Sequence, residues 1–184
     1  MGYLGITMGD PAGVGAEIVL KAMHTDAECR KNGIIFGSRA VTEYYNHLLG
    51  YGYQIKEIKA IEDFDPNCIN VVDPEPVSME KFNIGQVSSV CGHAAFVYVK
   101  TAIDWAISKK IDAVVTAPLN KEALHLAGHL YDGHTEIFND FAGTGRYAML
   151  LWSDKMKVIH VTTHVAMREA CNRIKKPRVE EVIR

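Results

Sequence analysis

Hydrophobic residues along this chain form short runs that alternate with longer amphipathic segments. The short runs are bounded mainly by glycine and proline, which is typical of strands, while the longer segments repeat their apolar positions with a helical period. The sequence predicts strands at residues 3–7, 33–37, 53–61, 68–73, 113–118, 147–152 and 157–163. It predicts helices at residues 16–23, 39–49, 90–109 and 121–127, and again from residue 167 onward.

This alternation predicts an α/β fold, with a largely parallel sheet and helices on both of its faces. The run 113–118, AVVTAP, is expected to be a buried strand. A last helix is predicted to start near Pro177, and the sequence ends about two helical turns later. We therefore expect residues 1–184 to be the N-terminal portion of a larger protein, one α/β unit plus the start of the next helix.

Composition excludes several classes of protein. The 184 residues are 48% hydrophobic with a net charge of −2, and no basic cluster is long enough to follow a nucleic-acid backbone. No apolar run approaches the roughly 20 residues of a membrane-spanning helix, and the first residues do not resemble a signal peptide. The four cysteines are scattered without a CxxC pair, which favours free thiols in a reducing cytoplasm.

The glycine-rich segment Gly9–Gly15 lies between a predicted strand and a predicted helix. Backbone N–H groups at a helix N-terminus favour anions. Its GxxxGxG spacing is neither the dinucleotide-binding fingerprint nor a P-loop. Anion binding and a simple tight turn therefore remain two open interpretations.

Two pairs of histidines have a spacing of four residues. His160 and His164 fall on a β-branched run, where residues four apart are separated by about 13 Å, so they cannot share one metal ion. His164, at the end of that run, is the better ligand candidate, and it needs partners from elsewhere in the fold. His125 and His129 lie on a helix that Gly128 ends, which favours capping or surface roles.

Two further segments are candidates for contacting a ligand. Lys121 follows the predicted strand 113–118, at the edge of the sheet where open α/β folds bind ligands. His134 and Thr135 follow Gly133 and can donate hydrogen bonds to phosphate or hydroxyl oxygens. Thr135 could also be the N-cap of a helix through residues 136–138.

Four motifs stand in a characteristic order and spacing: TMGDPAGVG at 7–15, TAPLNK at 116–121, GHTE at 133–136 and TTH at 162–164. Together they resemble the 4-hydroxythreonine-4-phosphate dehydrogenase (PdxA) family. The resemblance runs from one end of the chain to the other, and the form of the second and third motifs looks most like the branch that acts on 4-phospho-threonate or 4-phospho-erythronate.

The resemblance implies an isocitrate/isopropylmalate-dehydrogenase-like fold and a homodimer whose active site is shared between partners. It implies that His134 and Thr135 bind the substrate and that His164 is one of three histidines holding a divalent metal (zinc, magnesium or cobalt). The implied reaction is NAD- or NADP-linked oxidation, with decarboxylation, of a phosphorylated hydroxy acid such as 4-phosphohydroxy-L-threonine, a step of pyridoxine biosynthesis. It identifies neither a catalytic residue nor a cofactor-contacting residue in this sequence.

Two features of the family are missing from these 184 residues. Family members carry the other two metal-binding histidines in an Asn-Pro-His and a Tyr-His-Asp-Gln segment, and neither occurs here. We therefore expect the 184-residue chain alone to be inactive or nearly so. A non-catalytic dimerising or binding module, and a phosphate-binding domain of unrelated function, remain alternatives. The dehydrogenase interpretation requires the imidazoles of His134 and His164 to converge on one pocket.

Overall fold

The computed structural model describes residues 2–143 and 147–184 of the chain. These residues divide into two compact units, Met1–Ala142 and Gly143–Arg184. No helix within the described ranges is both long and apolar enough to cross a membrane.

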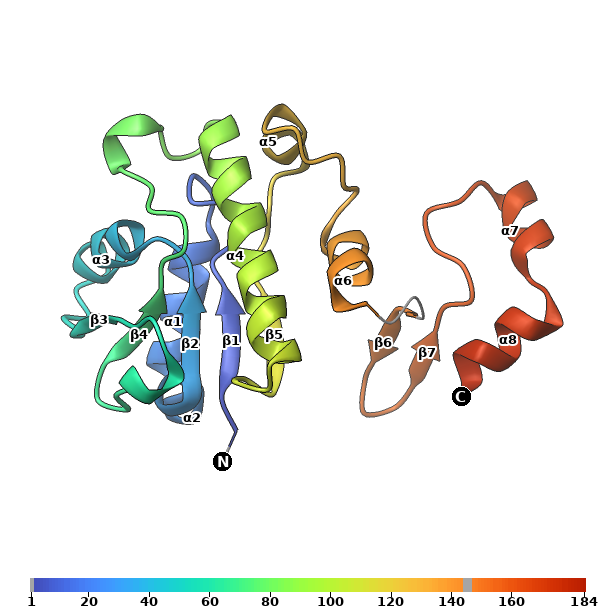
Figure 1. The fold of residues 1–184 in the computed structure, drawn as a ribbon, viewed down its shortest axis with the longest axis horizontal. Coiled ribbons are helices and arrows are strands. Elements are labelled where there is room, and N and C mark those ends of the chain that lie inside the picture. The colour runs from blue at the N-terminus through green and yellow to red at the C-terminus, as the bar shows by residue number, and fades with distance from the viewer. Residues whose placement is uncertain (1, 144–146) are drawn as a thin grey trace. The chain divides into compact units, whose positions relative to one another are not determined.

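The first unit is built on a five-stranded sheet in the order β3-β4-β2-β1-β5, and every neighbouring pair of strands is parallel (Figure 1). Strands β2 and β4 are buried along their whole length, as expected for runs of β-branched residues covered on both faces. The predicted parallel sheet is therefore confirmed. Its strands are β1 (Leu4–Thr7), β2 (Gly33–Phe36), β3 (Ile55–Glu57), β4 (Ile69–Val72) and β5 (Ala113–Thr116).

Helices cover both faces of this sheet, with α4 on one face and α1 and α2 on the other (Figure 1). Helix α1 buries Ala16, Val19, Leu20 and Met23, which recur with the helical period and therefore form one apolar stripe. The helices of this unit are α1 (Gly15–Thr25), α2 (Ala27–Asn32), α3 (Arg39–Leu48), α4 (Ser89–Ile107), α5 (Lys121–Leu126) and α6 (His134–Ala142), with 3₁₀ turns at Ile61–Asp63 and Met79–Lys81.

Strand β5 differs from its prediction, because it is only partly covered. It lies at one edge of the described sheet, and the side chain of Val115 is 48% exposed. A β-branched run predicts a strand but does not reveal whether a neighbour lies on each side. The expectation of a buried strand was wrong here for that reason.

The second unit contains a two-stranded sheet and two helices. The strands pair antiparallel, because only four residues connect them and a parallel pair needs a much longer crossover. The guanidinium of Arg178 donates hydrogen bonds to the carbonyl oxygens of Tyr147 and Val161, which ties the last helix to both flanks of the hairpin. The elements are β6 (Leu150–Trp152), β7 (Lys157–Ile159), α7 (Met167–Arg173) and α8 (Lys176–Ile183).

Candidate functional site

The loop after β1 is held tightly against the loop after β5. The backbone N–H of Asp10 donates to the carbonyl oxygen of Pro118 at 3.0 Å. Gly9 has a φ of +73°, and a Cβ atom there would lie 2.1 Å from the same oxygen. Only glycine satisfies both demands, so the Gly9 position fixes how closely the two loops approach.

The Asp10 side chain organises the rest of this loop. Asp10 is 5% exposed, and its side-chain Oδ1 accepts the backbone N–H of Ala12 at 2.8 Å. The backbone carbonyl oxygen of Asp10 accepts the N–H of Gly13 at 2.9 Å. Burial raises the pKa of the Asp10 carboxyl above its usual value, and the Ala12 hydrogen bond opposes that rise. Because the loop uses these two N–H groups on its own aspartate, it is poorly suited to cradle an anion.

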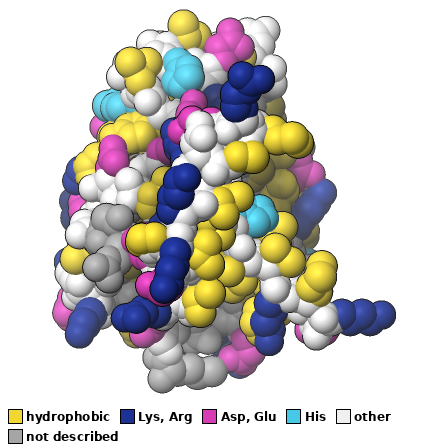
Figure 2. Space-filling view, turned by 90° about the vertical axis from the view of Figure 1, so that its right-hand side faces the viewer, with side chains coloured by type: hydrophobic (Ala, Val, Ile, Leu, Met, Phe, Trp, Pro, Cys, Tyr) yellow, Lys and Arg dark blue, Asp and Glu magenta, His cyan; other side chains and the backbone are white. Residues whose placement is uncertain are grey.

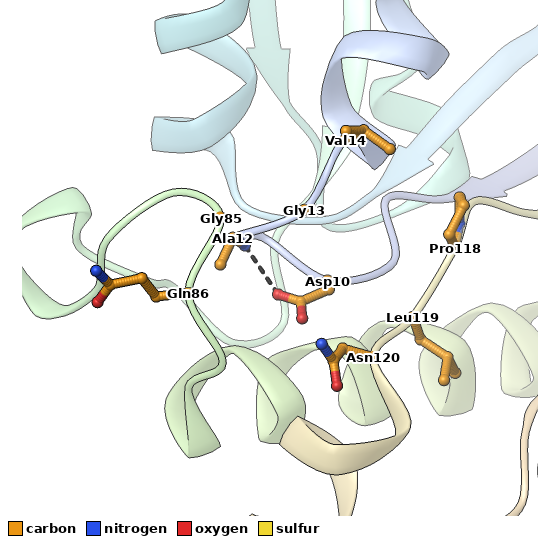
Figure 3. Close-up of a pocket in the computed structure, with 9 residues that line it drawn as sticks. All are labelled: Asp10, Ala12, Gly13, Val14, Gly85, Gln86, Pro118, Leu119 and Asn120. Carbon is orange, nitrogen blue, oxygen red and sulfur yellow. Dashed lines mark hydrogen bonds between the residues drawn. The ribbon is translucent and has the colours of Figure 1, made fainter.

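A pocket of about 300 Å³ lies between the two loops (Figure 3). It is at the carboxyl ends of β1 and β5, the edge where open parallel sheets bind ligands. From β1 the chain continues to β2, β3 and β4, which all lie on one side of β1. After β4 it crosses over and forms β5 on the other side of β1. The strand order therefore reverses at this point. The pocket is lined by Asp10, Ala12, Gly13, Val14, Gly85, Gln86, Pro118, Leu119 and Asn120.

Asn120 connects the pocket to helix α5. Its side-chain Oδ1 accepts the backbone N–H of Ala123 at 3.0 Å, so Asn120 is the N-cap of the helix. Lys121 follows in the first helical turn with an exposed side chain. The sequence pattern indicated Lys121 as a candidate but neither Asp10 nor Asn120, although both stand at junctions between a strand and a helix.

The two predicted substrate residues open helix α6. His134 is the first residue of the helix, so Thr135 lies inside the first turn and is not the N-cap. A Cβ atom on Gly133 would lie 4.0 Å from Lys121 Cε and 3.7 Å from Glu136 Oε2. The structure therefore brings the Lys121 side chain next to the segment that carries His134 and Thr135.

The His134 imidazole is partly buried in an unusual way. Its Nε2 is buried and has no hydrogen-bond partner among the described residues. Burial lowers the pKa of His134, so the ring is held neutral near pH 7. A buried polar atom without a partner is costly, which makes it a marker for a site that a ligand completes.

The predicted metal ligand His164 lies in the second unit, beyond the end of β7. Its side chain is exposed and its φ is +53°, a left-handed conformation that non-glycine residues seldom adopt outside functional sites and turns. Across residues 2–143 and 147–184, no group of three or more His, Cys, Asp or Glu side chains is placed to hold a metal ion. The described residues therefore do not form a metal centre by themselves. Whether His134 and His164 converge stays a prediction.

The first unit also contains a pair of histidines that the sequence did not predict. His93 Nδ1 and His129 Nε2 are 2.9 Å apart, and the His129 ring stacks on Phe96 with centroids 3.8 Å apart. His125 instead contacts the carbonyl oxygen of Tyr131 at 3.0 Å. The pairing of His93 with His129 spans 36 residues of sequence, so no local spacing could have revealed it.

Comparisons with known proteins agree with this architecture. The chain is 41% identical to D-threonate 4-phosphate dehydrogenase of Salmonella typhimurium over 184 residues, which is 97% of this chain and 55% of the relative. It is 33% identical to 4-hydroxythreonine-4-phosphate dehydrogenase of Sulfurihydrogenibium sp. over 181 residues, 98% of this chain and 55% of the relative. A crystal structure of 4-hydroxythreonine-4-phosphate dehydrogenase from Burkholderia phymatum matches with a TM-score of 0.89 and 37% identity, covering 100% of this chain and 56% of that one.

These comparisons show how much of each relative the chain covers and to which family it belongs. It spans about half the length of the curated relatives that it matches. The family model described as pyridoxal phosphate biosynthetic protein PdxA matches residues 29–184. With the parallel α/β sheet and the GHTE segment at the start of α6, this match shows that the chain belongs to the PdxA family.

Proposed function

We propose that the protein acts as an NAD- or NADP-linked dehydrogenase of a phosphorylated hydroxy acid, with D-threonate 4-phosphate as the favoured substrate. The relative that carries this substrate in its name is 41% identical to this chain over the 184 aligned residues. The relative named for 4-hydroxythreonine-4-phosphate is 33% identical over 181 aligned residues. The second substrate, 4-phosphohydroxy-L-threonine of the vitamin B6 route, is therefore the runner-up, and D-erythronate 4-phosphate a third of the same chemistry.

The observation that carries this proposal is the start of helix α6. There a buried, unpartnered His134 Nε2 lies on the first helical residue, and the Lys121 side chain lies beside the preceding Gly133. A neutral imidazole and a threonine hydroxyl donate hydrogen bonds, a lysine supplies positive charge, and the helix N-terminus favours an anion. This set suits the phosphate group of the substrate. Because the Glu136 carboxylate also lies beside Gly133, the positive charge of Lys121 is needed to offset its repulsion of the phosphate.

The proposed reaction removes a hydride from the carbon of a secondary alcohol and transfers it to the nicotinamide ring, while the hydroxyl proton leaves to a base. The resulting 3-oxo acid then loses CO₂. Holding the phosphate away from the reacting carbon lets its binding energy orient that carbon. No described residue is assigned as the base.

We propose His164 as one ligand of a divalent metal, which would polarise the reacting hydroxyl. Its left-handed backbone conformation supports a functional role. The described residues do not provide a complete set of ligands for this ion. We also propose a homodimer with a shared active site, and a cytoplasmic location in keeping with four free cysteines.

The phosphate role can be tested by calorimetric titration of the chain with D-threonate 4-phosphate and with D-threonate. We expect His134→Asn and Lys121→Met each to weaken binding of the phosphate ester by about tenfold, the cost of losing a hydrogen bond to a charged group. His47→Asn, on the exposed side of α3, is the matched control. Equal affinity for the phosphorylated and unphosphorylated acids would contradict the proposal.

Turnover is a separate measurement. With NAD⁺, a divalent metal and D-threonate 4-phosphate, we expect the 184-residue chain to form little or no NADH. Robust NADH formation would show that these residues contain the whole catalytic apparatus. A non-catalytic module that serves only for dimerisation, the alternative function, predicts binding of neither the acid nor its phosphate ester.

A further inference from the structure

The Asp10 carboxylate has a second oxygen that the loop does not use. Oδ1 accepts the Ala12 N–H, whereas Oδ2 accepts no hydrogen bond from any residue in the described ranges. Figure 3 shows this oxygen turned away from Ala12, on the side of the pocket where Asn120 lies. Asp10 is only 5% exposed, and one oxygen of its carboxylate faces the cavity. Such an oxygen is a strong hydrogen-bond acceptor that a ligand in the cavity can use.

The Asn120 amide faces this oxygen from the other loop. Because its Oδ1 accepts the N–H of Ala123, the amide orientation is fixed and its Nδ2 must point away from the helix. In Figure 3 that nitrogen is on the Asp10 side of the pocket, and no hydrogen bond joins the two side chains. The pocket therefore presents an acceptor and a donor to the same space.

The charge of the lining argues against a phosphate. None of the nine lining residues is Lys, Arg or His, and the one ionisable group among them is the Asp10 carboxyl. The N–H groups of Ala12 and Gly13 are already bonded to Asp10. A phosphate would meet a carboxylate with little to offset the repulsion.

We propose that the Asp10–Asn120 pocket binds neighbouring hydroxyl groups, a vicinal diol, and that phosphate binds separately at the start of α6. A hydroxyl can donate or accept, so one hydroxyl of the pair can donate to Asp10 Oδ2 while its neighbour accepts from Asn120 Nδ2. Carboxylates commonly recognise the ribose hydroxyls of dinucleotides in this way. The inference rests on the proposed function, which supplies two possible sources of the diol: a ribose of NAD⁺, or the hydroxyls of D-threonate 4-phosphate.

The first experiment needs no variant. The ¹⁵N-labelled chain is titrated separately with NAD⁺, D-threonate 4-phosphate and inorganic phosphate, and amide resonances are followed by NMR. We expect NAD⁺ or D-threonate 4-phosphate to shift the Asn120 side-chain NH₂ pair and the Ala12 and Gly13 amides, and whichever does so is the source of the diol. Inorganic phosphate should leave the Ala12 and Gly13 amides unchanged. A phosphate-induced shift at Asn120 is not diagnostic, because Asn120 directly precedes Lys121 of the proposed phosphate site.

The second experiment replaces the acceptor. Asp10→Asn can keep an oxygen for the Ala12 N–H, but it turns an NH₂ donor towards the pocket in place of Oδ2. Affinity for the ligand identified by NMR should fall at least about tenfold. Asp73→Asn is the matched control, because the Asp73 carboxylate also accepts one backbone N–H, from Arg39, yet does not line the pocket.

The outcomes separate this inference from the proposed function. If the ligands shift the amides of His134 and Thr135 but not those around Asn120, the diol site is wrong and the dehydrogenase proposal stands. If neither ligand shifts any resonance, both fail. An Asp10→Asn variant that folds and binds within about twofold of the unaltered chain, or a phosphate-induced shift of the Ala12 and Gly13 amides, also overturns the diol site.

Discussion

At the scale of single residues, the pocket depends on backbone atoms that nearly touch. Gly9 places its Cα against the carbonyl oxygen of Pro118, in a left-handed conformation. That contact sets the spacing between the loops that carry Asp10 and Asn120. A side chain at Gly9 would therefore change the site and the stability together.

Gly9→Ala should lower the free energy of unfolding by at least about 3 kcal/mol, since it combines a left-handed backbone cost with a backbone clash. Gly50→Ala is the control, because Gly50 has a similar φ of +68° but a methyl group there would meet nothing within 4 Å. The control should lose only about 1 kcal/mol. Urea denaturation of both variants measures the difference, and equal losses would mean that the Pro118 contact is unimportant.

The buried His134 ring makes stability depend on pH. Because its pKa in the folded protein is lowered by burial, the unfolded chain takes up a proton first as the pH falls. The contribution of His134 to the free energy of unfolding is complete above the pKa of the unfolded chain, about 6.5. It is lost as the pH falls from there through the lower pKa of the folded protein. His129, whose pKa burial and His93 also lower, adds to the same trend.

We therefore expect the melting temperature to fall between about pH 7 and pH 5, and to fall less steeply in His134→Asn. His47→Asn, at an exposed position of α3, is the matched control. Melting curves followed by circular dichroism at several pH values across this range give the slopes. A His134→Asn slope as steep as that of the control would mean that the ring is not held neutral by burial.

At the scale of elements, helices α4 and α5 touch through their backbones. A Cβ atom on Gly92 of α4 would lie 2.0 Å from the carbonyl oxygen of Ala123 in α5. Helix α5 carries Asn120 at its N-cap and Lys121 in its first turn. The close contact thus fixes the helix that supplies side chains to both proposed binding regions.

Gly92→Ala tests this contact by the sign of its effect. In an unconstrained helix the change would stabilise by about 0.5–1 kcal/mol. Here we expect destabilisation of about 2 kcal/mol, because backbone atoms cannot yield without moving α5. Urea denaturation gives the sign, and a stabilised variant would show that α5 is free to shift.

The sequence predicted elements better than it predicted their surroundings. Periodicity located every strand of the parallel sheet, because apolar runs between glycines reflect local chemistry. The exposure of Val115 and the pairing of His93 with His129 depend on distant parts of the chain, so local patterns could not reveal them. His134 was identified from its place after Gly133 and its side-chain chemistry, and the resemblance added its role, whereas Asp10 and Asn120 needed the loops to be placed together.

At the scale of the whole molecule, the second unit has little interior of its own. All three residues of β6 are exposed, with Trp152 at 65%, and so is Met167 at 85%. Figure 2 shows hydrophobic side chains at the surface beside Lys and Arg. A two-stranded hairpin is marginally stable alone, and exposed apolar surface of this kind marks an interface.

We predict that a second copy of the chain covers the β6–β7 hairpin in solution. Light scattering after size exclusion should give twice the mass of one chain, and Leu151→Lys should shift the population to monomer, because a charge buried in an apolar interface is costly. Leu126→Lys is the matched control, since Leu126 is a similarly exposed leucine on α5 of the first unit, and it should leave the dimer intact. A monomeric unaltered chain, or a dimer that survives Leu151→Lys, would assign this apolar surface to a different partner and would remove the basis for an active site shared between two copies.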